Sequence, residues 1–423
     1  MKIFRMLFVM AFAPLVLVGC NSENASTGAC TVSNTPTMAG NVIFRVTSLP
    51  SNHPADEAPF LAGTMNKWAA GSDLWKLAKN CDGTYQVEVP FAKAGDIALF
   101  KFTRGSWPKV EVDANGYDVA DRKVTYSDQT LINFTVAKWA DLEGGSKGKA
   151  PTATGDIRFE DVTLGSGTRK LRIYLPPDYT TNTSKNYPVL YMFDGQNLFD
   201  EKTAGFGSEW KVDETLEQFA KDGVTDGVIV VGIDNEGTGK GRYEEYTNWD
   251  WTHPTVGAIT ARGDETATWL VNTVIPFVNG KYRTLTGRAN TGLAGSSMGG
   301  YMTIYTGLAY PDVFGKLASF STVALDDPMQ GQNLRAYVEA AKTDGTKSPY
   351  IADTTVYIDI GDQEDLSYTT RPLLVDNHTQ MCASLTTAGY APTCSVITGG
   401  VHNEGAWSKR FGDVFKLLFP KAS

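Results

Sequence analysis

The sequence predicts two folded parts. Residues 40–140 are expected to form an all-β sandwich, and residues 155–423 an α/β fold whose mostly parallel sheet carries helices on both faces. In the first part, short runs of alternating apolar and polar residues are separated by turn signals, which is typical of a sandwich. In the second part, apolar strands alternate with segments of helical periodicity, which is typical of a parallel sheet. A length of 423 residues allows two such domains, each with its own core.

The sandwich is predicted from strands that follow one another without helices. Alternation begins at residues 41–46 and recurs at 83–89 and 97–102, and further strands are expected at 109–112 and 129–136. Helical periodicity is nearly absent before residue 140, so this part is expected to be all-β.

Residues 141–154, which are rich in glycine, lysine and serine, are expected to link the two domains. Beyond them, strands are predicted at residues 171–175, 189–193, 228–233, 291–294, 355–360 and 394–397, and helices at 266–279, 298–310, 373–388 and 406–418. Ligands bind such sheets at the carboxyl ends of the strands. Functional residues are therefore expected at that edge.

The first 19 residues have the pattern of an export signal, because a basic start precedes an apolar run at residues 6–18 that is too short for a permanent membrane span. The run ends in Leu17-Val18-Gly19-Cys20, which resembles the lipobox of bacterial lipoproteins. Cys20 is therefore expected to carry a lipid and to begin a tether at residues 20–39. Asn21 follows it instead of aspartate, which by resemblance to Gram-negative lipoprotein sorting implies the outer membrane. A plain secretory peptide cleaved elsewhere is the alternative.

Charge and motifs exclude several classes of function. The formal charge is -9, and it becomes -11 when the signal with Lys2 and Arg5 is removed. Nucleic-acid binding needs a concentrated basic face, so no nucleic-acid partner is expected. The stretch Gly237-Thr238-Gly239-Lys240-Gly241 lacks both dinucleotide and Walker spacings, and neither HExxH nor CxxC occurs. Neither a cofactor nor a metal is therefore expected.

Four cysteines remain once Cys20 is assigned to the lipid, and an even number suits an oxidising compartment. Four cysteines allow three pairings. The proposed division into domains favours Cys30 with Cys81 and Cys382 with Cys394.

A candidate nucleophile lies in the stretch Gly295-Ser296-Ser297-Met298-Gly299, between a predicted strand and a predicted helix. It matches the G-x-S-x-G nucleophile elbow, in which a strained turn lifts the serine above the sheet edge. Glycine two positions away on either side leaves room for that turn. The chain has 42 glycines, so the pattern needs support from its partners.

Four histidines are available as the general base. His53 lies in the first domain, His378 falls inside a predicted helix, and His253 lies in a tryptophan-rich loop before the nucleophile. His402 follows the last predicted strand, 105 residues after Ser297 (402 − 297 = 105). This order resembles that of α/β-hydrolases, in which the histidine follows the final strand. His402 is therefore the expected base, with His253 as the weaker rival.

The acid that orients the histidine is expected on the loop Gly361-Asp362-Gln363-Glu364-Asp365. Glu364 is favoured, because it has the G-x-x-D/E spacing found in similar α/β-hydrolases. Asp365 is the alternative, and Asp362 is less favoured. The oxyanion hole needs two backbone N–H groups. One is expected from Met298, and by topology and resemblance the other from Gln196, on the loop after the strand at 189–193.

The second domain resembles the esterase D family of α/β-hydrolases, which includes enterochelin esterases and feruloyl esterase domains. The resemblance runs from about Gly155 to Phe419. It is carried by the stretches Leu175-Pro176-Pro177-Asp178-Tyr179, Tyr187-Pro188-Val189-Leu190-Tyr191-Met192-Phe193-Asp194-Gly195, Gly232-Ile233-Asp234-Asn235, Tyr282-Arg283-Thr284 and Ala294-Gly295-Ser296-Ser297-Met298-Gly299-Gly300. It implies a serine carboxylesterase that needs no cofactor.

Members of this family often carry Arg-x-x-Glu-Tyr near the pocket, and the segment from Arg242 to Tyr246 fits this pattern. Trp249 and Trp251 follow closely. These residues, with Trp210, are expected to contact the substrate, and packing inside a loop is the alternative for the tryptophans.

The first domain resembles starch-binding and glycogen-binding modules through Gly63-Thr64-Met65-Asn66-Lys67-Trp68 and Lys101-Phe102-Thr103-Arg104-Gly105-Ser106-Trp107. Sugar binding needs exposed tryptophans that stack on pyranose rings. The candidates are Trp68, Trp75 and Trp107, and core packing is the alternative.

Together these features predict a lipid-anchored serine carboxylesterase that hydrolyses an ester through an acyl-enzyme. The substrate is expected to be a small-molecule or polysaccharide ester, with feruloyl or acetyl groups on carbohydrate favoured by the first domain. A siderophore ester is the alternative substrate. A carbohydrate-binding surface lipoprotein with an inactive hydrolase domain is the alternative from another class.

Overall fold

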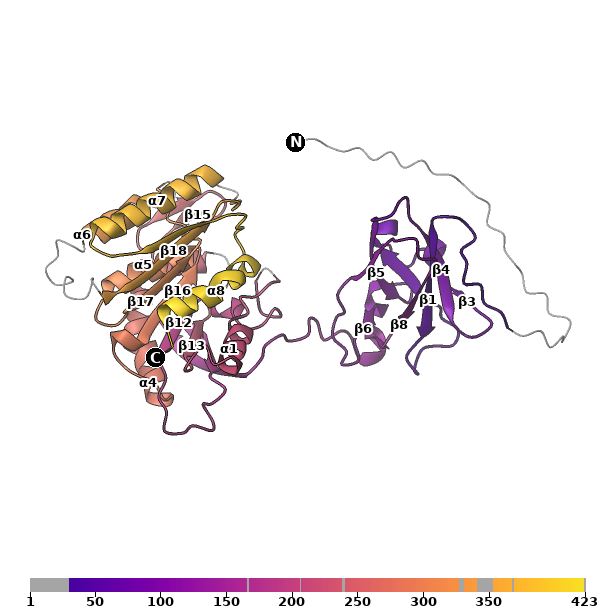
Figure 1. Ribbon diagram of the computed structural model, residues 1–423, viewed down its shortest axis with the longest axis horizontal. Helices are drawn as coiled ribbons and strands as arrows, with labels where there is room; N and C mark the ends of the chain where they lie inside the picture. The colour runs from indigo at the N-terminus through magenta and orange to yellow at the C-terminus, as the bar shows by residue number, and fades with distance from the viewer. Residues whose placement is uncertain are drawn as a thin grey trace. The chain divides into compact units, whose positions relative to one another are not determined.

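The structure is a computed structural model that describes residues 30–165, 167–205, 207–237, 240–326, 331–340, 353–366 and 369–421. The predicted signal and the lipidation site Cys20 lie outside these residues. The chain forms two compact units, one ending at Lys147 and the other beginning at Gly148 (Figure 1). Within the described residues, no helix has both the length and the apolar character needed to cross a membrane.

The first unit is a β-structure with short 3-10 turns. Its elements are β1 (Asn41–Ser48), β2 (Phe60–Gly63), η1 (Thr64–Asn66), η2 (Asp73–Trp75), β3 (Ala78–Lys79), β4 (Tyr85–Pro90), β5 (Ile97–Thr103), η3 (Trp107–Lys109), β6 (Glu111–Val112), β7 (Arg122–Thr125), β8 (Leu131–Thr135), β9 (Lys138–Trp139) and η4 (Ala140–Glu143). They form sheets of order β3-β4-β1-β8, β2-β5-β7 and β6-β9. Alternate residues of β1, Val42, Phe44 and Val46, enter a core shared with Phe100 and Trp139.

The second unit contains an eight-stranded sheet of order β10-β11-β13-β12-β16-β17-β18-β19. Pairing is antiparallel between β10, β11 and β13, and parallel from β13 to β19. The strands are β10 (Asp156–Leu164), β11 (Gly167–Leu175), β12 (Val189–Phe193), β13 (Ile229–Ile233), β16 (Thr291–Ser296), β17 (Lys316–Phe320), β18 (Thr355–Gly361) and β19 (Thr393–Ile397), and a separate hairpin pairs β14 (Trp251–His253) with β15 (Gly257–Ile259).

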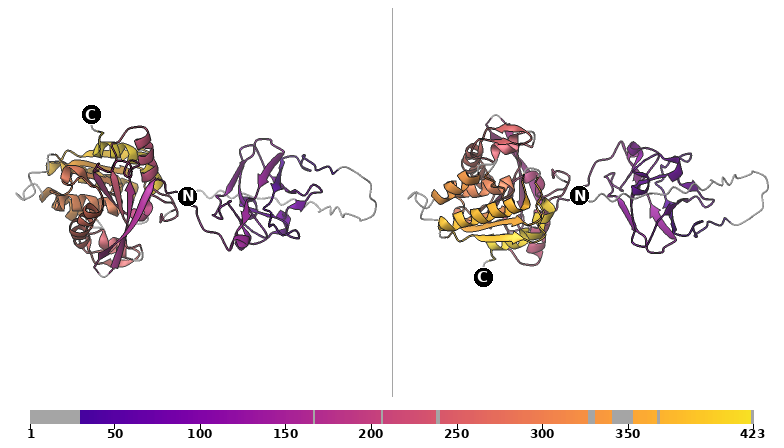
Figure 2. Two further views of the ribbon diagram at one scale, coloured as in Figure 1. Left: turned by 90° about the horizontal axis from the view of Figure 1, so that it is seen from below. Right: turned by 90° about the horizontal axis from the view of Figure 1, so that it is seen from above.

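Helices cover both faces of this sheet (Figures 1 and 2). They are η5 (Gly195–Asn197), α1 (Val212–Lys221), α2 (Gly241–Glu245), α3 (Gly263–Trp269), η6 (Leu270–Val274), α4 (Ile275–Lys281), η7 (Arg288–Asn290), α5 (Met298–Ala309), α6 (Gly331–Ala340), α7 (Arg371–Thr387) and α8 (Glu404–Leu418). Alternation along β12 shows the two faces: Leu190 and Met192 pack with α1 and α8, whereas Tyr191 packs with α3 to α7. The predicted fold class is confirmed.

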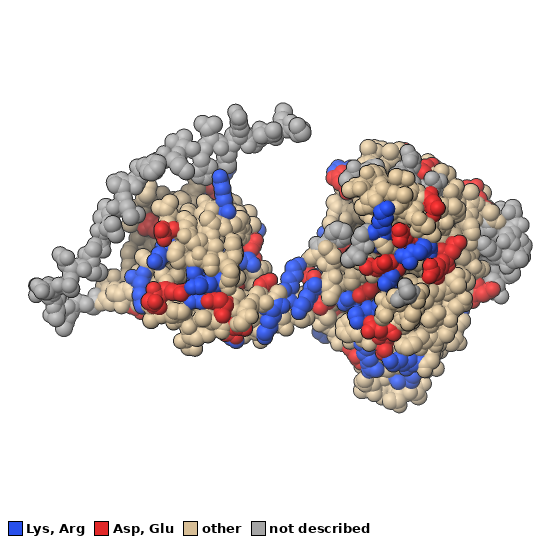
Figure 3. Space-filling view, turned by 180° about the vertical axis from the view of Figure 1, so that it is seen from behind, with Lys and Arg blue, Asp and Glu red and all other residues tan. Residues whose placement is uncertain are grey.

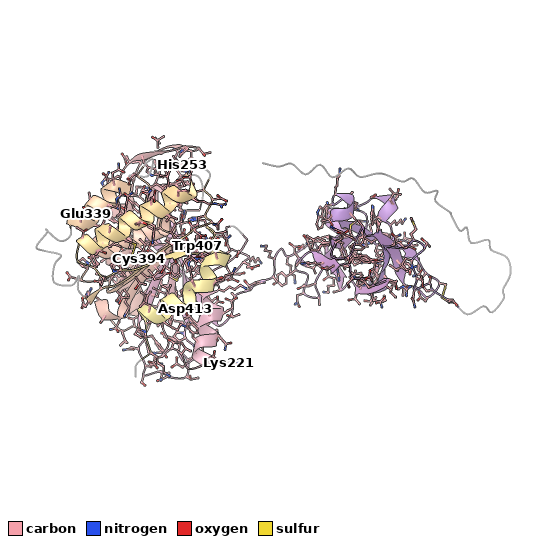
Figure 4. All side chains as sticks on the ribbon, turned by 45° about the horizontal axis from the view of Figure 1, so that its top comes forward. Lys221, His253, Glu339, Cys394, Trp407 and Asp413 are labelled. Carbon is pink, nitrogen blue, oxygen red and sulfur yellow. A yellow bond between two sulfur atoms is a disulfide. The ribbon has the colours of Figure 1, made fainter. Side chains whose placement is uncertain are left out.

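α1 and α8 lie side by side on their face of the sheet. Figure 4 marks Lys221 at the end of α1 and Asp413 on α8. The rings of Phe219 and Phe415 lie 6.0 Å apart between the two helices. On the face shown in Figure 3, basic and acidic side chains are intermixed.

The structure adds elements that the sequence patterns did not indicate. The strands β10 and β17 and the helices α1, α2 and α6 were not predicted, and the single helix expected at 266–279 is interrupted by a π-helical turn, η6. Pro276 at the start of α4 lacks an N–H, so the hydrogen-bond ladder of a continuous helix cannot pass through it.

Both predicted disulfides are confirmed. Cys30 is bonded to Cys81 in the first unit, and Cys382 to Cys394 in the second. The second bond joins α7 to β19, the strand that precedes the loop with His402.

Candidate active site

Ser297 stands on a strained turn between β16 and α5, with φ 59° and ψ -123°. Its amide N donates to the Phe320 carbonyl at 2.9 Å, which fixes the turn against β17. A Cβ atom on Gly295 would lie 2.5 Å from the carbonyl oxygen of Gly299, so this close approach of backbone requires glycine. The local sequence therefore produces the sharp turn that an elbow nucleophile needs.

His402 lies on the loop between β19 and α8, and its Nδ1 is 2.7 Å from Glu364 Oε2. Glu364 lies on the loop after the neighbouring strand β18, so two adjacent strands deliver the pair. With Nδ1 held by the carboxylate, Nε2 is the ring nitrogen left to exchange a proton. His402 and Ser297 line the same cleft. No hydrogen bond between Ser297 Oγ and His402 occurs among the described atoms, and bonds of this kind often form only with substrate bound.

The two other acids of the loop have different partners. Asp365 pairs with Arg371 through contacts of 2.9 and 2.5 Å, and Asp362 accepts a hydrogen bond from the Gly399 amide at 2.8 Å. Only Glu364, of the three, contacts the histidine.

Buried donors hold the Glu364 carboxylate oxygen that does not contact His402. Its Oε1 accepts hydrogen bonds from Ser321 Oγ at 2.5 Å and from the Gly361 amide at 2.7 Å. Burial would raise the pKa of Glu364, but the hydrogen bond and charge of His402, with the bonds from Ser321 and Gly361, hold this pKa below its ordinary value. The site therefore favours a charged carboxylate, which is the form that stabilises a protonated histidine.

Ser321 is itself oriented by a second layer. Its Oγ accepts from Trp407 Nε1 at 2.7 Å and from Arg410 Nη2 at 3.1 Å. Arg410 also pairs with Asp359 at 2.6 Å, and Asp359 accepts from the Ser321 amide at 2.8 Å. With both donors on its oxygen, the Ser321 hydroxyl has its own hydrogen free for Glu364.

The sequence reasoning missed this second layer. One signal was available: Asp359 is an acid inside the otherwise apolar strand β18, and a fully buried carboxylate requires a partner. Nothing local to Ser321 or Arg410 indicated that they meet, because they are separated by 89 residues.

The two predicted oxyanion donors lie at the starts of two helices. Met298 is the first residue of α5, and Gln196 is the second residue of the turn η5. The first N–H groups of a helix have no acceptor within it, so both amides are available to a ligand. Both residues line the cleft with Ser297.

Arg242 and Tyr246 support the Gln196 turn, and substrate contact by Arg242 stays a prediction. Arg242 Nε and Nη2 bind the two carboxylate oxygens of Asp194 at 2.8 and 2.7 Å, and Asn235 donates to the same carboxylate at 2.6 Å. The Asp194 amide donates to the Tyr246 hydroxyl at 3.2 Å. Arg242 lines the cleft, whereas Tyr246 is buried beneath it and is not among the lining residues.

The three tryptophans expected at the substrate site do not line this cleft. Trp210 is 1% exposed and packs against Trp407, with 5.4 Å between ring centroids. Trp251 is buried and donates to Thr247 Oγ1 at 3.3 Å. Trp249 packs against Tyr305 at 6.0 Å. The expectation of substrate contact was wrong for Trp210 and Trp251, because packing within the fold buries both rings, and for the half-buried Trp249 it stays a prediction.

The remaining histidines lie elsewhere. His253 is buried in β14 and its Nδ1 accepts from the Thr255 amide at 3.1 Å, while His378 is buried in α7. His53, in the first unit, accepts from Trp139 Nε1 at 3.0 Å. Trp407 packs edge-on against His402 and therefore marks the position of that histidine. In Figure 4, His253 lies on a different element from Trp407.

The cleft has a volume of about 1000 Å³, and both polar and apolar surface line it. Four acids line it, and each of the three aspartates is paired with an arginine: Asp194 with Arg242, Asp234 with Arg172 and Asp365 with Arg371. Glu404 is 2% exposed, and its Oε1 accepts from Asn197 Nδ2 at 2.9 Å. Its Oε2 is buried without a hydrogen-bond partner. Because this oxygen is buried and burial raises the pKa of Glu404, the side chain is not an open acceptor for a substrate hydroxyl.

In the first unit, two of the three candidate tryptophans lie together. Trp107 is 43% exposed, and its ring centroid is 6.2 Å from that of the half-buried Trp68. Trp75 is half-buried and packs against the core.

The family match agrees with this geometry. A family described as "Putative esterase" matches residues 164–417, which is more than half of the chain. The chain belongs to this esterase family. The match confirms the esterase resemblance drawn from the sequence motifs, and it covers Ser297, Glu364 and His402.

Individual proteins that resemble this chain match only part of it or share low sequence identity with it. The alpha-amylase of Niallia circulans is 35% identical over 120 residues, which are 28% of this chain and only 9% of the amylase. The uncharacterized protein YbbA of Bacillus subtilis strain 168 is 24% identical over 267 residues, 60% of this chain and 94% of YbbA. The siderophore hydrolase EstA from Aspergillus nidulans has a TM-score of 0.50 and 15% identity, covering 63% of this chain and 95% of EstA, and this likeness shows a shared fold.

Proposed function

We propose that the protein is a serine carboxylesterase in which Ser297 is the nucleophile, His402 the general base and acid, and Glu364 its orienting carboxylate. The contact of 2.7 Å between the buried Glu364 and His402, which lines the cleft with Ser297, carries this proposal. The Ser297 oxygen bonds to the ester carbonyl carbon while its proton passes to His402 Nε2. The Met298 and Gln196 amides stabilise the resulting oxyanion. His402 then protonates the departing alcohol, and water releases the acyl group by the same steps.

Covalent labelling and turnover test this proposal together. Ser297→Ala is expected to lose labelling by a fluorophosphonate and to lower kcat by about 10⁵-fold or more. Ser408→Ala is the matched control, because Ser408 lies on the nearby helix α8 and only donates to the Gly405 carbonyl. Unchanged labelling of a folded Ser297→Ala variant would exclude Ser297 as the nucleophile.

For the substrate we favour a neutral acyl ester on carbohydrate, with a feruloyl or acetyl group. The first unit supports this choice, because its Trp68 and Trp107 pair offers aromatic surface for a sugar ring. A turnover comparison of acetylated xylan, feruloyl esters and a siderophore ester tests the choice. Faster turnover of the siderophore ester would favour the alternative substrate.

A role in carbohydrate binding is proposed for the first unit. The Trp68 and Trp107 pair offers aromatic surface for a sugar ring, and the partial match to an alpha-amylase is in keeping with a carbohydrate ligand. If the protein binds insoluble glucan but resists fluorophosphonate, the binding-protein alternative would hold instead.

A lipid anchor at Cys20 is also proposed, on the lipobox-like sequence alone. Palmitate labelling and outer-membrane fractionation of the full chain, compared with Cys20→Ser, test it. Equal labelling of both chains would contradict it.

A further inference from the structure

Three carboxylates lie together at the start of α1, and none of them lines the cleft with Ser297. Glu209 precedes the helix, and Asp213 and Glu214 belong to its first turn. One carboxylate oxygen from each lies within 4.8 Å of the other two. Glu209 and Asp213 are both 0% exposed, and Glu214 is half-buried.

Each of these acids has a buried oxygen without a hydrogen-bond partner. Glu209 Oε1 accepts from Thr152 Oγ1 at 2.5 Å, and Asp213 Oδ2 accepts from the Thr154 amide at 2.6 Å. Glu209 Oε2, Asp213 Oδ1 and Glu214 Oε2 are buried and have none. Buried acceptors are almost always paired, because leaving one unpaired costs free energy. Three such acceptors in one cluster call either for protons shared between the acids, as between Asp213 and Glu214, or for a bound cation.

The cluster also lacks a counter-charge. Within the described part of the chain, none of the three acids forms an ion pair with lysine, arginine or histidine. Asp200 and Glu201 add negative charge near Glu209. The N-terminus of α1 supplies a partial positive charge of roughly half a unit, which is too little for three carboxylates.

We propose that Glu209, Asp213 and Glu214 bind a divalent cation, with Ca²⁺ as the best match. Carboxylate oxygens are the ligands that Ca²⁺ prefers, at about 2.3–2.6 Å. Two oxygens bound to one Ca²⁺ are then at most about 5 Å apart, and this agrees with a separation within 4.8 Å. The cation would satisfy the unpaired oxygens and neutralise most of the charge.

The cation would join α1 to the segment that begins the second unit. Thr152 and Thr154 already bind the other oxygens of Glu209 and Asp213, so a cation between the carboxylates would tie this segment to the helix. Cation binding is therefore expected to raise the stability of the second unit. The cation site does not depend on the proposed esterase chemistry, so an experiment can refute one proposal and leave the other standing.

Shared protons are the alternative way to relieve the repulsion. Burial raises the pKa of Glu209 to about 7 and, with Glu214 beside it, that of Asp213 to about 8. A cluster that only holds protons binds no metal, so metal binding itself distinguishes the two.

The purified full chain, stripped with EDTA, is titrated with CaCl₂ by calorimetry and its thermal unfolding is followed. One saturable site is expected. At about 100 times Kd, Ca²⁺ should raise Tm of the second unit by roughly 5–10 °C. Absence of saturable binding of Ca²⁺, Mg²⁺ and Mn²⁺ to the wild-type chain would overturn the proposal.

Variants locate the site. Glu209→Gln and Asp213→Asn are expected to weaken Ca²⁺ binding by about 100-fold or more and to abolish the Tm shift. Glu214→Gln, on the half-buried residue, is the milder variant if those two fold poorly. Asp413→Asn is the control, because its side chain is 83% exposed on α8. Undiminished binding in folded Glu214→Gln and Glu209→Gln would place the ion elsewhere and refute the assignment.

Discussion

Arg242 donates two hydrogen bonds to Asp194, of 2.8 and 2.7 Å, one to each carboxylate oxygen. Asp194 has φ 60°, a conformation that non-glycine residues rarely adopt, and it directly precedes the turn with Gln196. The pair therefore holds the backbone that is expected to supply one oxyanion donor.

Arg242→Ala should accordingly lower kcat and leave KM nearly unchanged. We expect a loss of about 10- to 100-fold, less than the 10²–10³-fold that follows complete removal of a donor. Steady-state kinetics on a soluble ester measures both constants. Arg122→Ala is the control, because Arg122 Nε and Nη2 likewise donate to the two carboxylate oxygens of Glu111, in the first unit. A rise in KM without a change in kcat would indicate that Arg242 contacts substrate instead.

Replacing the orienting carboxylate should disable the histidine without removing it. Glu364→Gln is expected to lower kcat by about 10⁴-fold, since the amide cannot stabilise a protonated His402. Asp365→Asn, beside it in sequence but paired with Arg371, should retain activity. If Asp365→Asn were the more damaging change, the acid would have been misassigned.

The pH dependence of stability follows from the same carboxylate. Its pKa is lowered in the folded protein, so its ionised form is favoured by folding. This contribution is complete above the unfolded-state value of 4.5 and is lost as pH falls through the lower folded value. Urea unfolding of wild type and Glu364→Gln should therefore show a stability difference that shrinks below pH 4.5. A difference that grew on acidification would contradict this sign.

Ser321 should act on activity through Glu364. Ser321→Ala removes a donor to Glu364 and leaves Trp407 Nε1 without an acceptor, so we expect a destabilisation of about 1–3 kcal/mol. We also expect the acidic limb of the kcat/KM profile to shift to higher pH, because the carboxylate loses a stabilising bond. Loss of stability with an unmoved pH profile would limit Ser321 to a structural role.

Carbohydrate binding by the first unit can be tested separately from ester hydrolysis. Trp107→Ala should weaken retention on insoluble glucan by about 10-fold or more, since a stacked aromatic ring contributes roughly 1–3 kcal/mol. Hydrolysis of a soluble ester should not change. Leu74→Ala, which removes an apolar side chain that is 80% exposed in the same unit, is the control.

Features encoded by short stretches of chain could be predicted from the sequence. The glycines around Ser297 specify the turn locally, and the position of His402 after the last strand follows from the order of elements. The buried parallel strands β12 and β13 gave clear apolar runs, whereas β10, an antiparallel edge strand with several exposed residues, did not. β17, with Lys316 and Ser319 in a short parallel strand, was also missed.

Features that depend on distant contacts could not be predicted in this way. Whether Trp210 faces a cleft or the core depends on Trp407, 197 residues later (407 − 210 = 197). The role of Arg242 depends on a carboxylate 48 residues earlier. In both cases the sequence singled out the residue as a candidate. It could not show which residues surround it, because tertiary packing determines those neighbours.

All the side chains that hold Glu364 come late in the chain. Ser321, His402, Trp407 and Arg410 follow the nucleophile, and the last three lie on α8 or the loop before it. A ribosome that has just completed the serine turn has therefore made the nucleophile without its base. Under the proposed mechanism, hydrolytic activity can begin only after nearly the whole polypeptide has been synthesised and folded. A chain cut just before α8 would keep His402 and Glu364 but lose Trp407 and Arg410, the two side chains that orient Ser321 against Glu364.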